Sequence, residues 1–267
     1  MTHHRLRGSL LLLMTALTQQ CIAAENAHRD VAVPGKPTAS AIQVSDGIAD
    51  CRKLHPYENA WLWTVATADG KVRTEGIWSD HLDNIEVEGR HLLRRVQGMS
   101  YVNARSYVGV TQFDARTCAP AMSEQHPVDG SINRHTVDGT HVVTQRTAKD
   151  GTITTAEVEL PSSAFDFFNG QDGLLLAALP LTVGYSGTIA AINEMGDGDG
   201  PKVAPFKVVR EELVSAGMRG AVHSFVVVSE LPGEYTSTYW ISEKPPYFIR
   251  LLVTYPDNRY SFYFDMI

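Results

Sequence analysis

From Trp61 onward, the chain alternates between short β-prone runs and Asp-Gly pairs. Between Trp61 and Ile153 the pairs stand at Asp69-Gly70, Asp129-Gly130, Asp138-Gly139 and Asp150-Gly151. Asp-Gly is favoured in two-residue hairpin loops, because both central residues of such a loop adopt positive φ. Turns of this kind, separated by runs rich in Val, Thr and aromatic residues, predict an antiparallel meander.

The register of the first hairpin supports this prediction. With Asp69-Gly70 as a two-residue loop, Trp61 lies opposite Trp78 and Trp63 lies opposite Gly76, where the missing side chain leaves room for the indole ring. One face of the hairpin then carries the apolar side chains Trp61, Trp63, Val65, Val72 and Trp78. We expect this face to belong to the core.

The strand pattern pauses between about 160 and 180. Leu174 to Leu179 is a helix-favouring run, Ser162 or Ser163 can cap it, and Pro180 ends it. The pattern predicts a helix or two short helical turns across 163–179, covering one face of the sheet. Further strands are expected at about 185–194, 202–215, 219–230, 235–242, 247–254 and 259–266.

Strand signals on both sides of one helical break favour a single large sheet over two separate domains. The predicted fold class is mainly β, with a large curved antiparallel sheet in the form of a half-open barrel and one short helical segment as cover. This β domain is expected over 59–267. Residues 25–58 are rich in Ala, Pro, Gly and Ser with little apolar periodicity, so they are expected to be a poorly ordered lead-in.

The first 24 residues have the layout of a secretory signal peptide. A basic segment precedes the apolar stretch 10–17, which is too short to span a bilayer, and small residues follow at Ala23 and Ala24. Gln19-Gln20 stand before Cys21, where a lipoprotein needs a small residue, so cleavage near Ala24 is favoured over lipid anchoring. No later apolar stretch is long enough to span a membrane.

The net charge and the cysteine content limit the cell compartment and the kinds of partner that we expect for this protein. Removal of residues 1–24 takes away two arginines and no acids, so the net charge moves from −7 to about −9. An acidic chain without a basic cluster argues against nucleic acid and anionic membrane surfaces as partners. Cys51 and Cys118 remain as an even pair, and we expect them to form a disulfide in the periplasm or outside the cell.

Catalytic signatures are weak. The segment GYSGT, residues 184–188, lacks the second glycine of an esterase elbow and stands at the start of a predicted strand. Ser242 and Lys244 have the wrong spacing for a serine–lysine pair, and two prolines follow where a helix would be needed. Motifs for zinc ligation are absent from the sequence, and no cofactor is indicated.

One group of polar residues passes a geometric test. Folding back at Asp129-Gly130 places His126 opposite Asn133 and Glu124 opposite His135, which puts Glu124, His126 and His135 on one face. The group is a candidate polar or metal-binding patch. The alternative is that this face is simply exposed to water.

The stretch YWISEKPPYFIRLLV, residues 239–253, has two readings. Ser242 and Arg250 could belong to a reactive or ligand-binding loop, with Arg250 as an anchor for an anionic group. Alternatively, the double proline marks a corner between two strands, because proline cannot donate to a sheet ladder. In a regular strand Arg250 shares a face with Phe248 and Leu252, and there it can pair with a neighbouring acid or reach the rim. The corner is the favoured interpretation, and Arg250 remains a candidate ligand-binding residue.

Several segments, taken in order, resemble one family of exported bacterial proteins. They are TQFDARTCAPAMSEQH with VDGSINRHTVDGTHVV, then FDFFNGQDGLLLAALPLTVGYSGTI, and finally YWISEKPPYFIRL. Their order is similar to that in the domain of unknown function 3108 group. The resemblance implies a periplasmic, curved sheet with helix cover, like the LolA/LolB lipoprotein-carrier fold, whose concavity can hold a hydrophobic ligand. It implies no catalytic residues.

The leading functional hypothesis is a non-enzymatic exported protein that binds an apolar or amphipathic, lipid-like ligand, or a cell-envelope protein, on a curved β-sheet. One alternative is a hydrolase or hydrolase accessory module that uses Glu124, His126 and His135, or Ser242 and Arg250. The other alternative is a structural scaffold without a ligand. A concave apolar pocket would favour the first hypothesis, and a carboxylate–histidine cluster with perturbed pKa values the second.

Overall fold

The computed structural model describes residues 41–103, 106–192, 202–231 and 234–265. The expected signal peptide, 1–24, lies outside these ranges. The described strands form one antiparallel sheet of 14 strands, which confirms the predicted mainly-β class. The first eight are β1 (Tyr57–Ala66), β2 (Val72–Val87), β3 (Arg90–Tyr101), β4 (Ser106–Asp114), β5 (Pro120–His126), β6 (Ile132–Asp138), β7 (His141–Thr147) and β8 (Ile153–Glu159). The others are β9 (Ser186–Ala191), β10 (Lys202–Ser215), β11 (Ala221–Leu231), β12 (Tyr235–Ile241), β13 (Phe248–Thr254) and β14 (Tyr260–Asp265).

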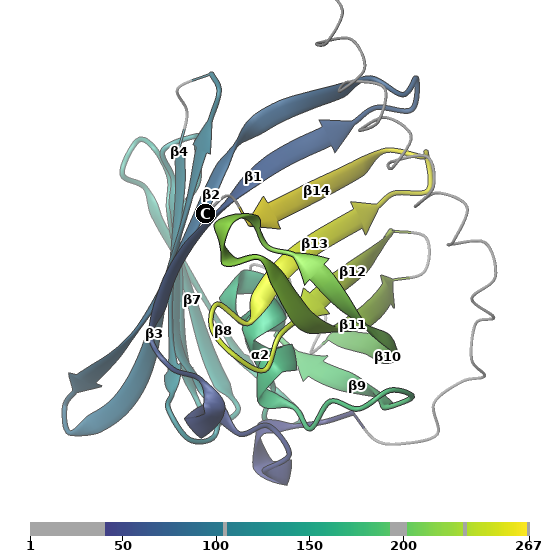
Figure 1. Cartoon of the computed structure of the whole chain (residues 1–267). Helices are drawn as coiled ribbons and strands as arrows, with labels where there is room; N and C mark the ends of the chain where they lie inside the picture. Colours follow the sequence, from purple (N-terminus) through teal and green to yellow (C-terminus); the bar gives the residue numbers. More distant parts are fainter. Residues whose placement is uncertain (1–40, 104–105, 193–201, 232–233, 266–267) are drawn as a thin grey trace, which may run out of the picture. The chain divides into compact units, whose positions relative to one another are not determined.

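The sheet consists of two meanders joined through their outer strands. Strands β1 to β8 follow one another in space, as do β9 to β14, and pairing of β1 with β14 joins the two series. The sheet is not closed, because β8 and β9 are its two edges. Figure 1 shows the two series as blue-to-teal and green-to-yellow strands. Except for β8 and β9, each strand pairs with the next in sequence, so local hairpins account for most of the topology.

The chain between β8 and β9 crosses the face of the sheet that carries the main core, which we call the inner face. It contains the π-helical turn η3 (Phe167–Gln171) and the helix α2 (Asp172–Ala178), which are two short helical elements within the predicted range 163–179. η3 contacts β4, whereas α2 contacts β12 and β13, so this connection touches both series of strands. A Cβ atom at Gly173 would collide with the ring of Phe248, which shows how closely α2 lies on β13.

The described part of the lead-in is packed against the core, which differs from the expected lack of order across 25–58. It contains the single 3-10 turns η1 (Val44–Asp46) and η2 (Cys51–Lys53), and its residues Ile42, Ala49, Cys51 and Leu54 are buried. Ile42 also bridges to Ile189 on the free edge of β9. Few apolar residues suffice here because the surrounding sheet supplies the rest of the hydrophobic contact.

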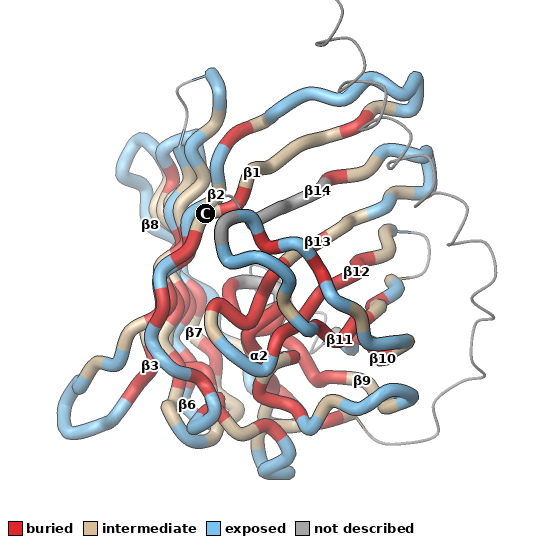
Figure 2. Tube along the Cα trace, in the orientation of Figure 1, coloured by how far each residue is buried: buried red, intermediate tan, exposed pale blue. Residues whose placement is uncertain are grey.

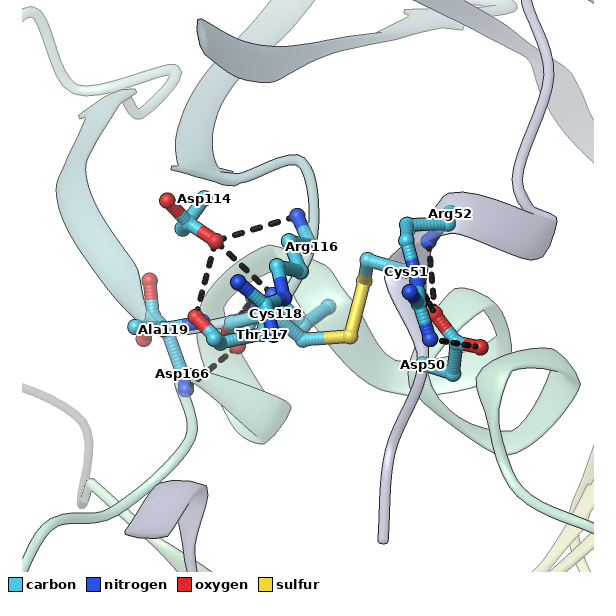
Figure 3. Close-up of a disulfide and its surroundings, with 10 residues drawn as sticks. Asp50, Cys51, Arg52, Asp114, Arg116, Thr117, Cys118, Ala119 and Asp166 are labelled. Atoms are coloured by element: carbon cyan, nitrogen blue, oxygen red, sulfur yellow. Dashed lines mark hydrogen bonds and ion pairs between the residues drawn. A yellow bond between two sulfur atoms is a disulfide. The ribbon is translucent and has the colours of Figure 1, made fainter. Parts of the chain in front are cut away.

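The predicted disulfide between Cys51 and Cys118 is present and links η2 to the β4–β5 loop (Figure 3). Both cysteines are fully buried. Asp114 shapes the loop by accepting hydrogen bonds from the backbone N–H groups of Arg116 and Thr117 at 3.0 and 2.8 Å. Cys51 N–H donates to the Arg116 carbonyl at 3.1 Å, so the covalent link is reinforced by the backbone.

The Asp-Gly turns are correct in position but mostly different in type from the expected two-residue loop. The N–H groups of Gly70, Gly130 and Gly151 donate to carbonyls three residues earlier, and these glycines have positive φ. This is the three-residue loop in which glycine forms a bulge. It shifts the pairing of the flanking strands by one residue relative to the expected register.

In the β1–β2 hairpin a bulge restores the expected register. Ala66 pairs with Val72 next to the turn, and the register shifts between Trp63 and Thr64, after which Trp61 pairs with Trp78 as predicted. The tryptophan pair is therefore confirmed, with ring centroids 5.9 Å apart. Val72 lies on the turn side of the bulge and is exposed, so its predicted place in the core face is wrong.

The main core lies on the inner face (Figure 2), with Trp61, Phe248 and Leu174 at its centre. The smaller cluster of Val137, Val142, Leu160, Ala164, Ala190 and Ile192 connects β6 and β7 with β9 and so fills the gap between the sheet edges. None of the helices in the described ranges reaches the length and hydrophobicity that a membrane-crossing helix needs.

We expect the double variant Cys51→Ala/Cys118→Ala to lose stability. The disulfide closes a loop across a sequence separation of 67 residues. Loss of that constraint in the unfolded chain should lower the free energy of unfolding by about 2–4 kcal/mol, measured by guanidinium chloride denaturation. A thiol reductant should bring the wild type to the same midpoint and leave the variant unchanged. Equal midpoints for the variant and the oxidised wild type would contradict the prediction.

Candidate functional site

The predicted group of Glu124, His126 and His135 does not form. We expected Glu124 opposite His135, whereas the structure pairs Ser123 with His135 and Glu124 with Arg134. The three-residue loop at Gly130 is the cause, because a shift of one residue moves a side chain to the other face of the sheet. His135 therefore lies on the face opposite Glu124 and His126.

The separated residues have different surroundings. His126 contacts Glu124 at 2.8 Å in a partly exposed position. His135 is buried, and its Nδ1 lies 2.9 Å from Thr144 Oγ1. Burial lowers the pKa of His135, so its ring is neutral at pH 7. Across the described ranges, no group of three or more His, Cys, Asp or Glu side chains could hold a metal ion.

His135 belongs instead to a band of buried polar side chains on the inner face of β1 to β7. Cross-strand pairing places Arg95 beside Thr111, Thr111 beside Ser123, and Ser123 beside His135. Several buried atoms of this band have no hydrogen-bond partner among the residues that the structure describes: both amide atoms of Asn59, Gln97 Nε2, Ser123 Oγ, Asn133 Oδ1 and His135 Nε2. The inner face is therefore polar along one series of strands.

The band contains a buried cation, Arg95. Its side chain is 1% exposed and forms an ion pair with the fully buried carboxylate of Asp80, with Nη2 2.6 Å from Oδ2. Arg95 Nε also donates to both Asp80 oxygens, at 2.9 and 3.0 Å. Nη1 donates to the Gly170 carbonyl and to Asp172 Oδ1, both at 2.9 Å. All three nitrogens of the guanidinium group thus donate hydrogen bonds.

This network is highly coupled. Tyr57 donates its hydroxyl to Asp80 Oδ2 at 2.8 Å. Burial and the negative charge of Asp80 raise the pKa of Tyr57 well above its ordinary value, so the phenol stays protonated. Burial by itself lowers the pKa of Arg95, but the charge and hydrogen bonds of Asp80, together with the charge of Asp172, outweigh it, and the pKa is raised. Arg95 therefore stays charged inside the protein.

The sequence contains a pattern that predicts part of this network. The Trp61–Trp78 pair, continued by two residues along the same ladder, places Asp80 on the core face beside Asn59. An acid at a core position needs a buried cation, and on β3 the same face carries Arg95. The helical partner, Asp172, could not be located in this way because no local pattern links it to β3.

Arg250 lies on the other face of β13. A bulge between Trp240 and Ile241 in the β12–β13 pairing places Arg250 opposite Trp240. Its guanidinium carbon is 5.5 Å from the Trp240 ring centroid, and Nη2 donates to the Ser215 carbonyl at 3.4 Å. The bulge also moves Ile249 into the outer cluster with Trp240, whereas the predicted companion Phe248 lies in the main core.

Ser242 lies at the predicted corner between β12 and β13. Its hydroxyl accepts a hydrogen bond from the Lys244 N–H at 3.1 Å, and its own N–H donates to the Tyr247 carbonyl at 2.7 Å. Pro245-Pro246 follows in the turn. These contacts give Ser242 a role in closing the corner, which agrees with the favoured interpretation of this stretch.

A pocket of about 270 Å³ lies on the inner face of β11, β12 and β13. Cross-strand neighbours form its wall, with Ser229 beside Ser237, Ser237 beside Val253, and Tyr239 beside Leu251. Its lining is Phe167, Asp172, Ser229, Leu231, Tyr235, Ser237, Tyr239, Leu251, Val253 and Tyr255. Asp172 also binds Arg95, so the pocket adjoins the buried ion-pair network.

The comparisons with known proteins identify no family. No protein-family model and no curated protein matches the chain. Among solved structures, the chain is similar to a β-barrel-like protein of domain of unknown function 1849 from Brucella abortus, with a TM-score of 0.43 and 11% sequence identity. The match covers 79% of this chain and 95% of that chain. So distant a likeness carries no argument about the site.

Replacing Asp80 with Asn should destabilise the fold strongly. The variant leaves Arg95 buried without its main counter-ion, and breaking such a pair costs about 3–5 kcal/mol in free energy of unfolding. The matched control is Asp83→Asn on the same strand, where the ion pair with Arg94 is partly exposed. We expect the control to lose less than about 1 kcal/mol in chemical denaturation. Similar losses for both variants would contradict the buried network.

In contrast to Asp80→Asn, the variant Ser123→Ala should stabilise the fold. Because Ser123 Oγ is buried without a partner, its removal should raise the free energy of unfolding by about 1 kcal/mol. Ser131→Ala is the control, since the buried Ser131 hydroxyl donates to Asp129 Oδ1 at 2.7 Å. Its loss should cost about 1 kcal/mol. A destabilised Ser123→Ala variant would show that the hydroxyl has a partner.

Proposed function

We propose that this protein is an exported, non-enzymatic binding protein that takes an apolar or amphipathic ligand into the pocket between β11, β12 and β13. The single observation that carries the proposal is the composition of the pocket. Leu231, Leu251 and Val253 supply apolar surface, aromatic rings supply more, and a small number of polar groups lie among them. Small-molecule sites have this combination of apolar lining and a few orienting polar groups.

The size of the pocket limits the ligand. About 270 Å³ is just below the usual range for small-molecule sites, roughly 300–1,000 Å³. The pocket therefore suits a small amphipathic molecule, or the end of a longer one. The resemblance to the domain of unknown function 3108 group supports the same kind of ligand, and we include membership of that group in the proposal.

Export to the periplasm or the exterior is part of the same proposal. The signal-peptide layout of residues 1–24 supports it. The buried disulfide between Cys51 and Cys118 supports it as well, since such bonds persist in oxidising compartments.

Filling the pocket should abolish binding. Val253→Trp places an indole among the lining residues, and we expect it to weaken binding of the hydrophobic fluorescent probe N-phenyl-1-naphthylamine roughly tenfold or more. The control is Thr254→Trp, which adds the same ring at the next, exposed position of β13. Circular dichroism should show both variants folded, and Ser237→Leu serves as a milder filling variant.

Native mass spectrometry of the purified full chain provides the second readout. A co-purifying small molecule should be retained by the wild type and by Thr254→Trp, and lost in Val253→Trp. If the wild type carries no small molecule and also fails to bind the probe, the proposal is wrong. Equal probe binding by all variants would likewise show that this pocket is not the site.

A further inference from the structure

The pocket has one ionised group, Asp172, among otherwise neutral lining residues. Asp172 Oδ1 accepts a hydrogen bond from Arg95 Nη1 at 2.9 Å. Within the described residues, no side chain or backbone group donates to Oδ2. The side chain of Asp172 keeps 23% of its surface exposed and that of Arg95 keeps 1%, so Asp172 joins the buried network to the pocket. A ligand can therefore reach a carboxylate oxygen with an open hydrogen-bonding position.

The network beneath the pocket carries an excess of negative charge. It contains two carboxylates, from Asp80 and Asp172, and one guanidinium, from Arg95, which leaves one negative charge. Because these groups are largely removed from water, the charge is screened much less than it would be at the surface. Tyr239 borders the same pocket, and burial, together with the charge of Asp172, raises the pKa of its hydroxyl.

Arg95 cannot serve as an anion site for a ligand. Its nitrogens are directed to Asp80, to the Gly170 carbonyl and to Asp172, and the side chain is fully buried. Arg259 lies near one lining ring, with its guanidinium carbon 5.1 Å from the Tyr255 centroid. It is paired with Asp257 at 2.7 Å, so that pair adds no net charge to the pocket.

The aromatic lining complements a positive charge. Phe167, Tyr235, Tyr239 and Tyr255 all border the pocket. The faces of aromatic rings attract cations, and groups of such rings bind ammonium ions, including quaternary ones. A carboxylate together with four aromatic side chains thus fits an organic cation, whereas a purely anionic head group such as a carboxylate or sulfate would meet a like charge.

We propose that the ligand of this pocket carries an organic ammonium group, with Asp172 as its counter-ion, the aromatic rings around it and an apolar tail along Leu231, Leu251 and Val253. This inference rests on the proposed binding function and names its ligand class. The ammonium group can belong to a free amphipathic amine or to a zwitterionic lipid head group, and these sources share the same recognition chemistry.

Isothermal titration calorimetry on the purified protein tests the inference with ligands that differ in their head groups. The set is octyltrimethylammonium, 1-octanol and octyl sulfate, each below its aggregation concentration. The wild type should bind the ammonium compound most tightly and octyl sulfate most weakly. Dihexanoyl-phosphatidylcholine is added to distinguish the sources, since affinity equal to that of octyltrimethylammonium indicates a lipid head group and much weaker affinity a free amine.

The variant Asp172→Asn removes the charge and keeps an oxygen that can accept from Arg95. It should weaken octyltrimethylammonium binding roughly tenfold to a hundredfold and leave 1-octanol binding unchanged. The control Asp83→Asn changes the net charge of the chain equally at a site outside the pocket lining, and should leave every affinity as in the wild type.

The outcomes separate this inference from the proposed function. If octyl sulfate binds as well as the ammonium compound, or if Asp172→Asn keeps the cation preference, the inference is wrong although the pocket still binds ligands. If none of the compounds binds, the proposed function itself fails. The wild-type ranking decides the matter even if the Asn variant does not fold.

Discussion

The buried charge of Arg95 is the constraint on which the arrangement of the inner face depends. A guanidinium removed from water needs both a counter-ion and acceptors for its remaining N–H groups. Asp80 on the neighbouring strand supplies the first, but the others come from the Gly170 carbonyl and Asp172 in the connection between the two series of strands. The connection must therefore cross the inner face next to β3. That position places α2 against β12 and β13, and it brings Asp172 to the pocket.

The segment before β1 also contacts the connection between β8 and β9. The disulfide attaches Cys51 to the β4–β5 loop, and the Asp50 N–H donates to the Ala178 carbonyl at the end of α2. The hydroxyl of Tyr247 donates a hydrogen bond to the Lys53 carbonyl at 2.9 Å and accepts one from the His55 N–H at 2.8 Å. One short stretch of chain is thus fastened to β4–β5, to α2 and to the β12–β13 corner. The ion-pair network and this segment thus connect strands of both meanders to the connection that lies between them.

The fold was more predictable from the sequence than the site, and the Asp-Gly turns show why. The dipeptide identifies where the chain reverses, but it fits a two-residue loop and a three-residue loop equally well, and these differ by one residue in register. In the β1–β2 hairpin a bulge corrects the shift, and the Trp61–Trp78 pair forms. In the β5–β6 hairpin the pairing continues without a bulge, so His135 lies on the other face from Glu124. A register shift of one residue leaves the positions of the strands along the chain unchanged, but it separates side chains that a predicted site needs on the same face.

A site that depends on non-local contacts is also hidden from local patterns. Asp80 and Arg95 occupy core positions that strand alternation can identify, but Asp172 reaches them only because the connection folds back across the sheet. The result is an inner face with a polar band along β1 to β7 and, along β11 to β13, a pocket wall that includes Leu231, Leu251 and Val253, and Asp172 adjoins both. A charged head group is stabilised beside a carboxylate and an alkyl chain beside Leu and Val, so in the proposed complex this boundary would set the orientation of the ligand. Its cationic end would lie against the buried network and its tail along Leu231, Leu251 and Val253.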